Sequence, residues 1–195
     1  MTDFIRRVVD DKLTGAKNWR KPVRFDATNN MSFFMGMITA GKKIKLNLRL
    51  NILQADDEKE VTLKELLTRP TIVSVYMRNN TPGCDRQNDS LAAHTDEFHA
   101  AGFNVVALSR DTCGSHRKYA AKKNIRYILA SDPEDNFARA TDSIVEKSMY
   151  GRTYSGPARA AYVIDTDGTV LAVVSKVDTK DHAVQLQEVL ATLQS

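Results

Sequence analysis

The stretch TIVSVYMRNNTPGC, residues 71–84, places a cysteine at the junction of a predicted strand and a predicted helix. Residues 71–76 are mostly apolar and β-branched, which is typical of a buried central strand. Gly83 allows a tight turn and Pro82 stiffens the approach to it, so we expect a helix to begin near Cys84. This order of strand, turn and helix favours an α/β fold.

A cysteine at the start of a helix is well placed to ionise. The thiolate is the nucleophile, and an ordinary thiol with a pKa of about 8.5 is only a few per cent ionised at neutral pH. The unpaired N–H groups of the first helical turn, and the positive end of the helix dipole, favour the anion. We therefore expect Cys84 to be a reactive thiolate.

Two further residues are candidates for holding this thiolate. Thr81 lies three residues before Cys84 on the same turn, so its hydroxyl can reach the sulfur or a substrate oxygen. Arg159 stands at the start of a predicted strand, and a guanidinium near the sulfur favours the thiolate. Such a site suits attack on a peroxide O–O bond, with the leaving oxygen stabilised by the hydroxyl and the guanidinium. The product is a sulfenic acid on Cys84.

N-terminal to residues 71–84, two patterns predict further elements. Apolar and polar side chains alternate over residues 44–52, which predicts a strand with one buried face. Residues 56–58 are predicted to form a turn. Thr62 and Glu65 form a capping-box pattern, which predicts a short helix that Pro70 ends.

C-terminal to Cys84, helical and strand patterns alternate. They predict helices over residues 84–101, 111–123 and after 131–133, strands over 103–109, 126–129, 160–164 and 169–176, and a last helix over 182–193. Alternation of strands and helices predicts a parallel sheet that is covered on both faces. The closing hairpin around residues 165–168 adds antiparallel strands, so we expect a mixed sheet.

Length and charge bound the remaining possibilities. The chain has 195 residues, 42% of them hydrophobic and 27% charged, which is typical of one globular domain with an extension. We assign residues 44–195 to the domain and 1–43 to the extension, in which residues 2–14 predict a short amphipathic helix. The net charge of +4 comes from 28 cations interspersed with 24 anions, so we expect no nucleic-acid partner. No apolar run approaches the roughly 20 residues of a membrane span, so we expect no membrane partner either.

The chain has only two cysteines, Cys84 and Cys113. Residues 1–15 contain no apolar core of a signal peptide, so we expect a reducing cytoplasm, where a sparse cysteine is reactive or inert rather than structural. The residues after Cys84 lack the second cysteine of a C-x-x-C dithiol. The four histidines show no ligand spacing with the cysteines, so we expect no metal and no cofactor.

The stretch around Cys84 and five further blocks, in a fixed order, carry a family resemblance. The stretch 73–84 resembles the peroxidatic motif of peroxiredoxins, in the bacterioferritin-comigratory (Q-type) branch. The further matches are residues 107–111 with 115–116, 131–133, 147–154, Arg159 and 163–168, so that the resemblance covers roughly residues 44–195.

The resemblance implies a thioredoxin-like fold and an antioxidant enzyme that reduces hydrogen peroxide or organic hydroperoxides with thiol electrons. It implies that Cys84 is the peroxidatic cysteine and that Thr81 and Arg159 are its partners in catalysis. It also implies thioredoxin or another thiol as the reductant, no cofactor, and a monomer or homodimer.

Two residues depart from the family pattern near Cys84. Met77 stands where the family usually has a proline that shields the cysteine. Met77 can still shield the site, but it removes a backbone constraint and brings an oxidisable sulfur close to peroxide. Asp85 stands where the family often has threonine, and its carboxylate both suits a helix start and repels a thiolate.

The resolving cysteine is the third departure. Many relatives have it five residues after the first, which is Asp89 here, and others in the following helix near Ala120. Cys113, near the start of that helix, is a candidate resolving residue only if local unwinding brings the two Cα atoms within about 4.4–6.8 Å. The alternatives are a bridge between subunits, a one-cysteine cycle closed by an external thiol, or a Cys113 that only packs near the helix start.

A second hypothesis is a binding module without peroxidase chemistry. Residues 31–37 form an apolar stretch, and an exposed apolar patch there would mark an interaction surface. In this reading Cys84 is inert and Arg159 forms an ordinary surface ion pair.

Overall fold

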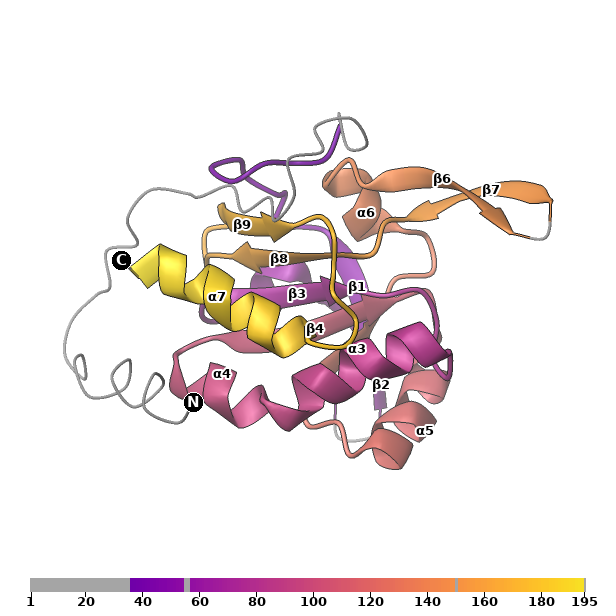
Figure 1. Cartoon of the computed structure of the whole chain (residues 1–195), viewed down its shortest axis with the longest axis horizontal. Coiled ribbons are helices and arrows are strands. Elements are labelled where there is room, and N and C mark those ends of the chain that lie inside the picture. The colour runs from indigo at the N-terminus through magenta and orange to yellow at the C-terminus, as the bar shows by residue number, and fades with distance from the viewer. Residues whose placement is uncertain (1–35, 55–56, 150, 195) are drawn as a thin grey trace.

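The structure, a computed structural model, describes residues 36–54, 57–149 and 151–194 (Figure 1). The amphipathic helix predicted over residues 2–14 and most of the apolar stretch 31–37 lie outside the described residues. The division of the chain at residue 43 therefore stays a prediction.

A seven-stranded mixed sheet forms the centre of the molecule. Its strands are β1 (Arg49–Gln54), β2 (Asp57–Thr62), β3 (Thr71–Val75), β4 (Asn104–Ser109), β5 (Ile128–Ser131), β8 (Ala160–Ile164) and β9 (Val170–Val174), in the order β2-β1-β5-β4-β3-β8-β9. Strands β3, β4 and β5 run parallel, and the other neighbouring pairs are antiparallel. The predicted mixed sheet is thereby confirmed.

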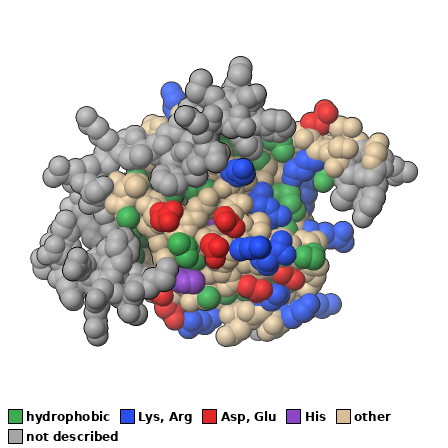
Figure 2. All heavy atoms as spheres, viewed as in Figure 1, with side chains coloured by type: hydrophobic (Ala, Val, Ile, Leu, Met, Phe, Trp, Pro, Cys, Tyr) green, Lys and Arg blue, Asp and Glu red, His purple; other side chains and the backbone are tan. Residues whose placement is uncertain are grey.

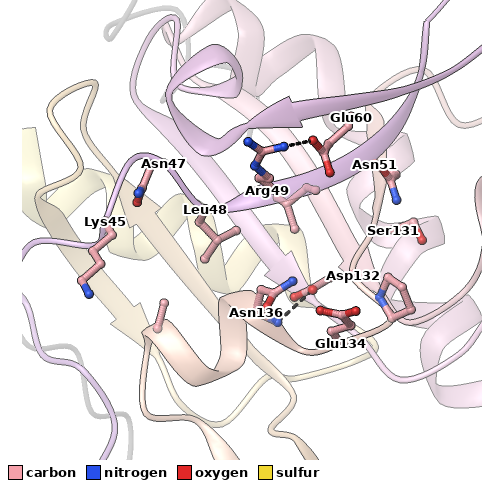
Figure 3. Close-up of a pocket in the computed structure, with 13 residues that line it drawn as sticks. Lys45, Asn47, Leu48, Arg49, Asn51, Glu60, Ser131, Asp132, Glu134 and Asn136 are labelled. Atoms are coloured by element: carbon pink, nitrogen blue, oxygen red, sulfur yellow. Dashed lines mark hydrogen bonds and ion pairs between the residues drawn. The ribbon is translucent and has the colours of Figure 1, made fainter.

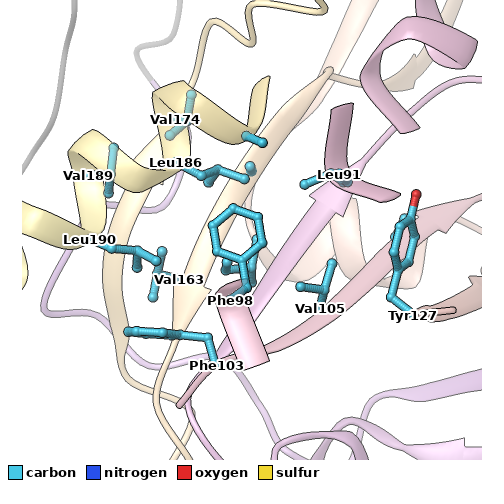
Figure 4. Close-up of a cluster of buried hydrophobic side chains, with 14 of the residues drawn as sticks. Leu91, Phe98, Phe103, Val105, Tyr127, Val163, Val174, Leu186, Val189 and Leu190 are labelled. Carbon is cyan, nitrogen blue, oxygen red and sulfur yellow. The ribbon is translucent and has the colours of Figure 1, made fainter. Parts of the chain in front are cut away.

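Helices cover both faces of this sheet. On one face lie α3 (Pro82–Ala93), α4 (Thr95–Ala100), α5 (Cys113–Lys123) and α7 (His182–Gln194), and Figure 1 shows α3, α4 and α7 in front of the strands. Their apolar side chains, among them Leu91, Phe98 and Leu186, meet Val105 and Val163 of the sheet (Figure 4). The short helices α2 (Leu63–Leu66) and α6 (Asn136–Ala140) pack on the opposite face.

The strand predicted over residues 44–52 has the expected buried apolar side chains, but its regular hydrogen-bonded pairing covers only the second half of that range. Ile44, Leu50 and Ile52 are buried and the polar residues between them are more exposed. Regular pairing nevertheless starts at Arg49, because Ile44 instead donates its amide to Gly168 beside β9.

The turn predicted at residues 56–58 is wrong in part, because Asp57 and Glu58 already belong to β2. The first four residues of β2 are charged and exposed, and they pair with β1 at the sheet edge. Charged side chains are a usual protection of an edge strand, and they remove the apolar alternation that predicts one.

The helix predicted over residues 84–101 is two helices with a break at His94. The first begins two residues early, at Pro82, since proline in the first turn loses no helical hydrogen bond. The helix predicted after residues 131–133 begins only at Asn136, whose amide donates to the Asp132 carboxylate at 2.8 Å. The predicted capping box is confirmed, with the Thr62 amide donating to Glu65 at 2.7 Å.

A two-stranded hairpin lies outside the central sheet and was not predicted. It consists of β6 (Ile144–Met149) and β7 (Arg152–Pro157), and it extends away from the body in Figure 1. Residues 144–148 alternate only between exposed and half-buried, so the hairpin has no apolar face that a sequence pattern would show.

Candidate active site

Cys84 is the third residue of α3 and is 1% exposed. It packs with Tyr76 and Leu91 in the apolar layer between the sheet and its helices. Pro82 and Gly83 precede it in the first turn, as the sequence predicts, so the sulfur lies beside backbone amides that no helical carbonyl pairs.

Arg159 reaches Cys84 because of how two strands pair. Strand β8 runs antiparallel to β3, with Ala160 opposite Val75, so Arg159 stands at the end of β3 from which the chain leads into α3. One terminal guanidinium nitrogen, Nη2, lies 3.4 Å from the Cys84 sulfur. The other donates to the side-chain oxygen of Gln87, one turn along α3.

Thr81 is the N-cap residue of α3 and has extended backbone angles. Its hydroxyl donates to the Arg78 carbonyl at 2.9 Å, and it also forms a hydrogen bond that favours the Cys84 thiolate. Because a hydroxyl has one proton, Thr81 serves either the carbonyl or an anion at any moment. The structure thus brings Cys84, Thr81 and Arg159 together, as expected.

The electrostatic balance favours the thiolate. Burial is the strongest influence on Cys84 and by itself would raise the thiol pKa. Hydrogen bonds from the Thr81 hydroxyl and from the backbone of Arg78 and Met77 act in the opposite direction, together with the charge of Arg159. Their sum holds the pKa of Cys84 below its ordinary value.

A second cation lies at this site and was not predicted. Lys147 of β6 donates its ammonium to the Pro157 carbonyl at 2.5 Å and contacts the sulfur of Met77. Burial, followed by the nearby guanidinium groups of Arg159 and Arg110, lowers the pKa of Lys147. Lys147 belongs to the matching block 147–154, but the sequence assigns it no role, because the hairpin that carries it to the site was not predicted.

Comparison with known proteins places this geometry in a family. The model of the AhpC/TSA family matches residues 42–173. The chain belongs to the AhpC/TSA family. Over 136 residues it is 32% identical to Peroxiredoxin Bcp of Xanthomonas campestris, a match that covers 70% of this chain and 83% of that protein. Over 126 residues it is 30% identical to Peroxiredoxin Bcp of Escherichia coli, covering 65% of this chain and 81% of that protein.

Solved structures agree with the sequence comparison. A structure of Xanthomonas campestris peroxiredoxin Q superposes with a TM-score of 0.71 and 27% identity, covering 80% of this chain and 99% of that one. A second structure of the same protein, from work on its alkyl peroxide reduction activity, gives a TM-score of 0.71 at 26% identity, with the same coverage. The Q-type branch and the thioredoxin-like fold expected from the sequence are thereby confirmed.

Within this AhpC/TSA-family site, Asp85 turns away from the sulfur toward α5. Its carboxylate accepts a hydrogen bond of 2.8 Å from the Tyr119 hydroxyl and lies 3.6 Å from the Lys123 ammonium. Lys123 also forms an ion pair of 2.9 Å with Asp89. The residue that departs from the family pattern therefore connects the start of α3 to α5.

Cys113 begins α5 and is also 1% exposed. Burial, followed by the charge and hydrogen bond of Glu58, raises the pKa of its thiol to about 11. The groups that act on Cys113, Glu58 and Arg117, differ from those that act on Cys84. Both cysteines are free thiols, and the environment of Cys113 favours the protonated, unreactive form.

A cavity of about 490 Å³ lies elsewhere, between β1 and the loop before α6 (Figure 3). Neither Cys84 nor Arg159 lines it. Its buried carboxylate, Asp132, already accepts the amides of Asn136 and Phe137. This cavity therefore contributes nothing to the chemistry at Cys84.

Metal and membrane features are absent from the part of the chain that the structure describes. Among residues 36–54, 57–149 and 151–194, no three His, Cys, Asp or Glu side chains come together as a metal site would require. Within the same residues no helix has the length and apolar character to cross a bilayer. Figure 2 shows basic and acidic side chains interspersed on the face that carries α3 and α7.

Proposed function

We propose that Cys84 is the peroxidatic cysteine of a thiol-dependent peroxidase that reduces hydrogen peroxide and organic hydroperoxides. The observation that carries this proposal is the Arg159 guanidinium at 3.4 Å from a buried thiol whose pKa is lowered. Family membership supports the same activity, since the relatives are peroxiredoxins and a structural neighbour is described as an alkyl peroxide reductase. It does not favour the alternative of a binding module.

The reaction follows from the charges at the site. The Cys84 thiolate attacks one peroxide oxygen, an S–O bond forms, and the O–O bond breaks. The sulfur loses two electrons and becomes a sulfenic acid, while the departing oxygen takes the negative charge and a proton to leave as water or an alcohol. Arg159 and Thr81 can stabilise the charge both on the sulfur and on the departing oxygen.

Returning Cys84 to the thiolate requires two further thiol electrons. A thiol attacks the sulfenic sulfur, releases water and forms a disulfide, which a second thiol then reduces. The raised pKa of Cys113 and its separate surroundings support a cycle in which an external thiol, such as thioredoxin, performs the first step. Resolution by Cys113 within the chain would require local unwinding that brings the two Cα atoms within about 4.4–6.8 Å. Resolution between two subunits of a homodimer would require both buried sulfurs to become accessible.

Intact mass after one equivalent of hydrogen peroxide tests the chemistry on fully reduced protein. We expect the gain of one oxygen on Cys84. Loss of two hydrogens from the monomer would instead indicate a bridge to Cys113, and a disulfide-linked dimer would indicate resolution between subunits. Normal peroxide consumption by Cys84→Ser would contradict the proposed role of this cysteine.

The cytoplasmic location stays a prediction. The free state of both cysteines is compatible with it.

A further inference from the structure

Behind Arg159, three fully buried polar side chains continue the hydrogen bonding into the protein interior. Gln87 of α3, Ser74 of β3 and His182 of α7 are each 0% exposed. The Gln87 side-chain nitrogen donates to the Ser74 hydroxyl at 2.8 Å, and that hydroxyl lies 3.0 Å from Nε2 of His182. We call Arg159, Gln87, Ser74 and His182 the arginine relay.

The donors in the arginine relay point in one direction. Arg159 can only donate, which fixes the oxygen end of the Gln87 amide toward the guanidinium. The amide nitrogen of Gln87 then donates to the Ser74 hydroxyl, which is also hydrogen-bonded to Nε2 of His182. Hydrogen bonds aligned in this way polarise one another, and the oxygen acceptors of Gln87 and Ser74 both face toward the positive charge.

The relay requires a neutral imidazole at its far end. Nδ1 of His182 has no hydrogen-bond partner within the described residues, so the ring bonds through Nε2, which accepts from Ser74 in one neutral tautomer and donates to it in the other. Burial first, and then the charge of Arg159, lower the pKa of His182 to about 4, although Gln185 acts against them. His182 is therefore uncharged throughout the neutral pH range.

Ser74 and His182 are polar side chains buried in the apolar layer between β3 and α7, where such groups are uncommon. Burying polar groups costs free energy unless they are hydrogen-bonded, and here the bonds lead to a single charged side chain. The relay also joins parts of the chain that are distant in sequence, since Ser74 and His182 are 108 positions apart. Its members come from β3, α3, α7 and the start of β8, so any shift of one element would move the guanidinium.

We propose that Ser74 and His182 are positioning residues, which act through Gln87 to hold the Arg159 guanidinium against the sulfur of Cys84. This inference rests on the proposed peroxidase function. With the relay intact, Nη2 stays aimed at the reacting atoms while the other nitrogen is anchored to Gln87. Without it, Gln87 loses a buried acceptor and the guanidinium is free to take other positions.

The test uses Ser74→Ala and His182→Leu in the full chain. Two quantities are measured: the second-order rate of Cys84 oxidation by hydrogen peroxide, and the pH profile of Cys84 alkylation read from its peptide. We expect the oxidation rate to fall about 10- to 100-fold and the alkylation profile to move to higher pH, because misplacing a catalytic group by about 1 Å has effects of this size. His182→Gln, which can still accept from Ser74, should recover most of the rate.

Two comparisons separate positioning from general loss of structure. Thr95→Val removes another buried hydroxyl, which donates to the Leu91 carbonyl at 2.9 Å and has no bond to the relay, so it should keep the wild-type rate. In an Arg159→Ala background, Ser74→Ala should add no further loss, since its effect passes through Arg159. An equal loss in that background, or wild-type rate and alkylation profile in folded Ser74→Ala and His182→Leu, would overturn the inference.

The same measurements distinguish failure of the relay from failure of the proposed function. A wild-type protein that does not react with peroxide would refute the peroxidase, while the alkylation profile of Cys84 would still report on the position of Arg159. An unshifted alkylation profile in both relay variants, with rapid peroxide reaction in all three proteins, would refute the relay alone.

Discussion

At the scale of single residues, the reactivity of Cys84 depends on groups that overcome its burial. A thiol that is 1% exposed would ordinarily resist ionisation. The lowered pKa therefore requires the donors around the sulfur, and Arg159 is the one that contributes a full charge. In the proposed reaction Arg159 also contacts the departing oxygen, so it contributes both to the lowered pKa of Cys84 and to stabilising the leaving group.

Replacing Arg159 by alanine tests this dependence. We expect peroxide oxidation of Cys84 to slow by about 100- to 1000-fold, as when one oxyanion donor is removed. The oxidation rate depends on pH because the thiolate is the reactive form of Cys84. In the wild type the rate persists below the ordinary thiol pKa of about 8.5 and falls only through the lowered pKa. In Arg159→Ala the fall should begin at a higher pH.

Two controls accompany the Arg159 experiment. Arg159→Lys keeps a positive charge but not the two-pronged donor, so it should retain part of the lowered pKa and less of the rate. Arg49→Ala removes an exposed arginine paired with Glu60 at the sheet edge and should leave both quantities unchanged. An Arg159→Ala protein with the wild-type pH profile would show that the backbone amides and Thr81 suffice for the thiolate.

At the scale of elements, the start of α3 is tied to α5. The bonds are Tyr119 to Asp85 at 2.8 Å, Lys123 to Asp89 at 2.9 Å, and Lys122 to Asn80 at 2.9 Å. Unwinding the first turns of α3, which is one way to bring Cys84 toward Cys113, would strain or break these bonds. The link between the two helices therefore opposes an internal disulfide and protects the first turn of α3.

Removing the Tyr119 hydroxyl tests this link. Tyr119 is 1% exposed and its bond is to a carboxylate, so Tyr119→Phe should lower the free energy of unfolding by about 1.5 kcal/mol. The amides of residues 83–85 should also exchange with deuterium faster than in the wild type. Arg126→Ala, which breaks an exposed pair with Asp96, should change neither by more than about 0.5 kcal/mol. Unchanged exchange in Tyr119→Phe would refute the link.

Elements were predictable from sequence where local chemistry alone determines them. The strand ending at Val75, the capping box at Thr62 and the hairpin of β8 and β9 follow from short-range patterns that packing does not override. The edge strand β2 and the hairpin of β6 and β7 lack a buried apolar face, so periodicity gives no signal for them. The break at His94 depends on how α4 packs, which one helix pattern does not show.

At the scale of the whole molecule, the site joins residues that only the fold brings together. Thr81 is local to Cys84, but Arg159 is 75 positions away and arrives through the antiparallel pairing of β8 with β3. The sequence predicted Arg159 from its place at the start of a strand and from a family pattern, and neither gives a distance to Cys84. Gln87 could have been found, because a residue three positions after Cys84 lies on the same side of a helix. Lys147 and His182 could not, since their roles depend on a hairpin and a helix packing elsewhere.

The layer between the sheet and α7 holds this assembly together, and Leu186 tests it. Leu186 is 0% exposed within the cluster of Figure 4, so Leu186→Ala should cost about 2–5 kcal/mol of unfolding free energy through lost burial and the cavity left behind. Ile144, by contrast, is 37% exposed on the β6–β7 hairpin, and Ile144→Ala should cost less than about 0.5 kcal/mol.

Denaturant unfolding of both variants gives the measurement, followed by far-UV circular dichroism and by alkylation of Cys84. If the layer forms one cooperative unit, loss of structure and exposure of Cys84 should share a midpoint in Leu186→Ala. Exposure of Cys84 at clearly lower denaturant than the loss of helix would mean that the first turn of α3 opens independently of α7. In that case the bonds from α5, rather than the apolar layer, would control access of peroxide to the sulfur.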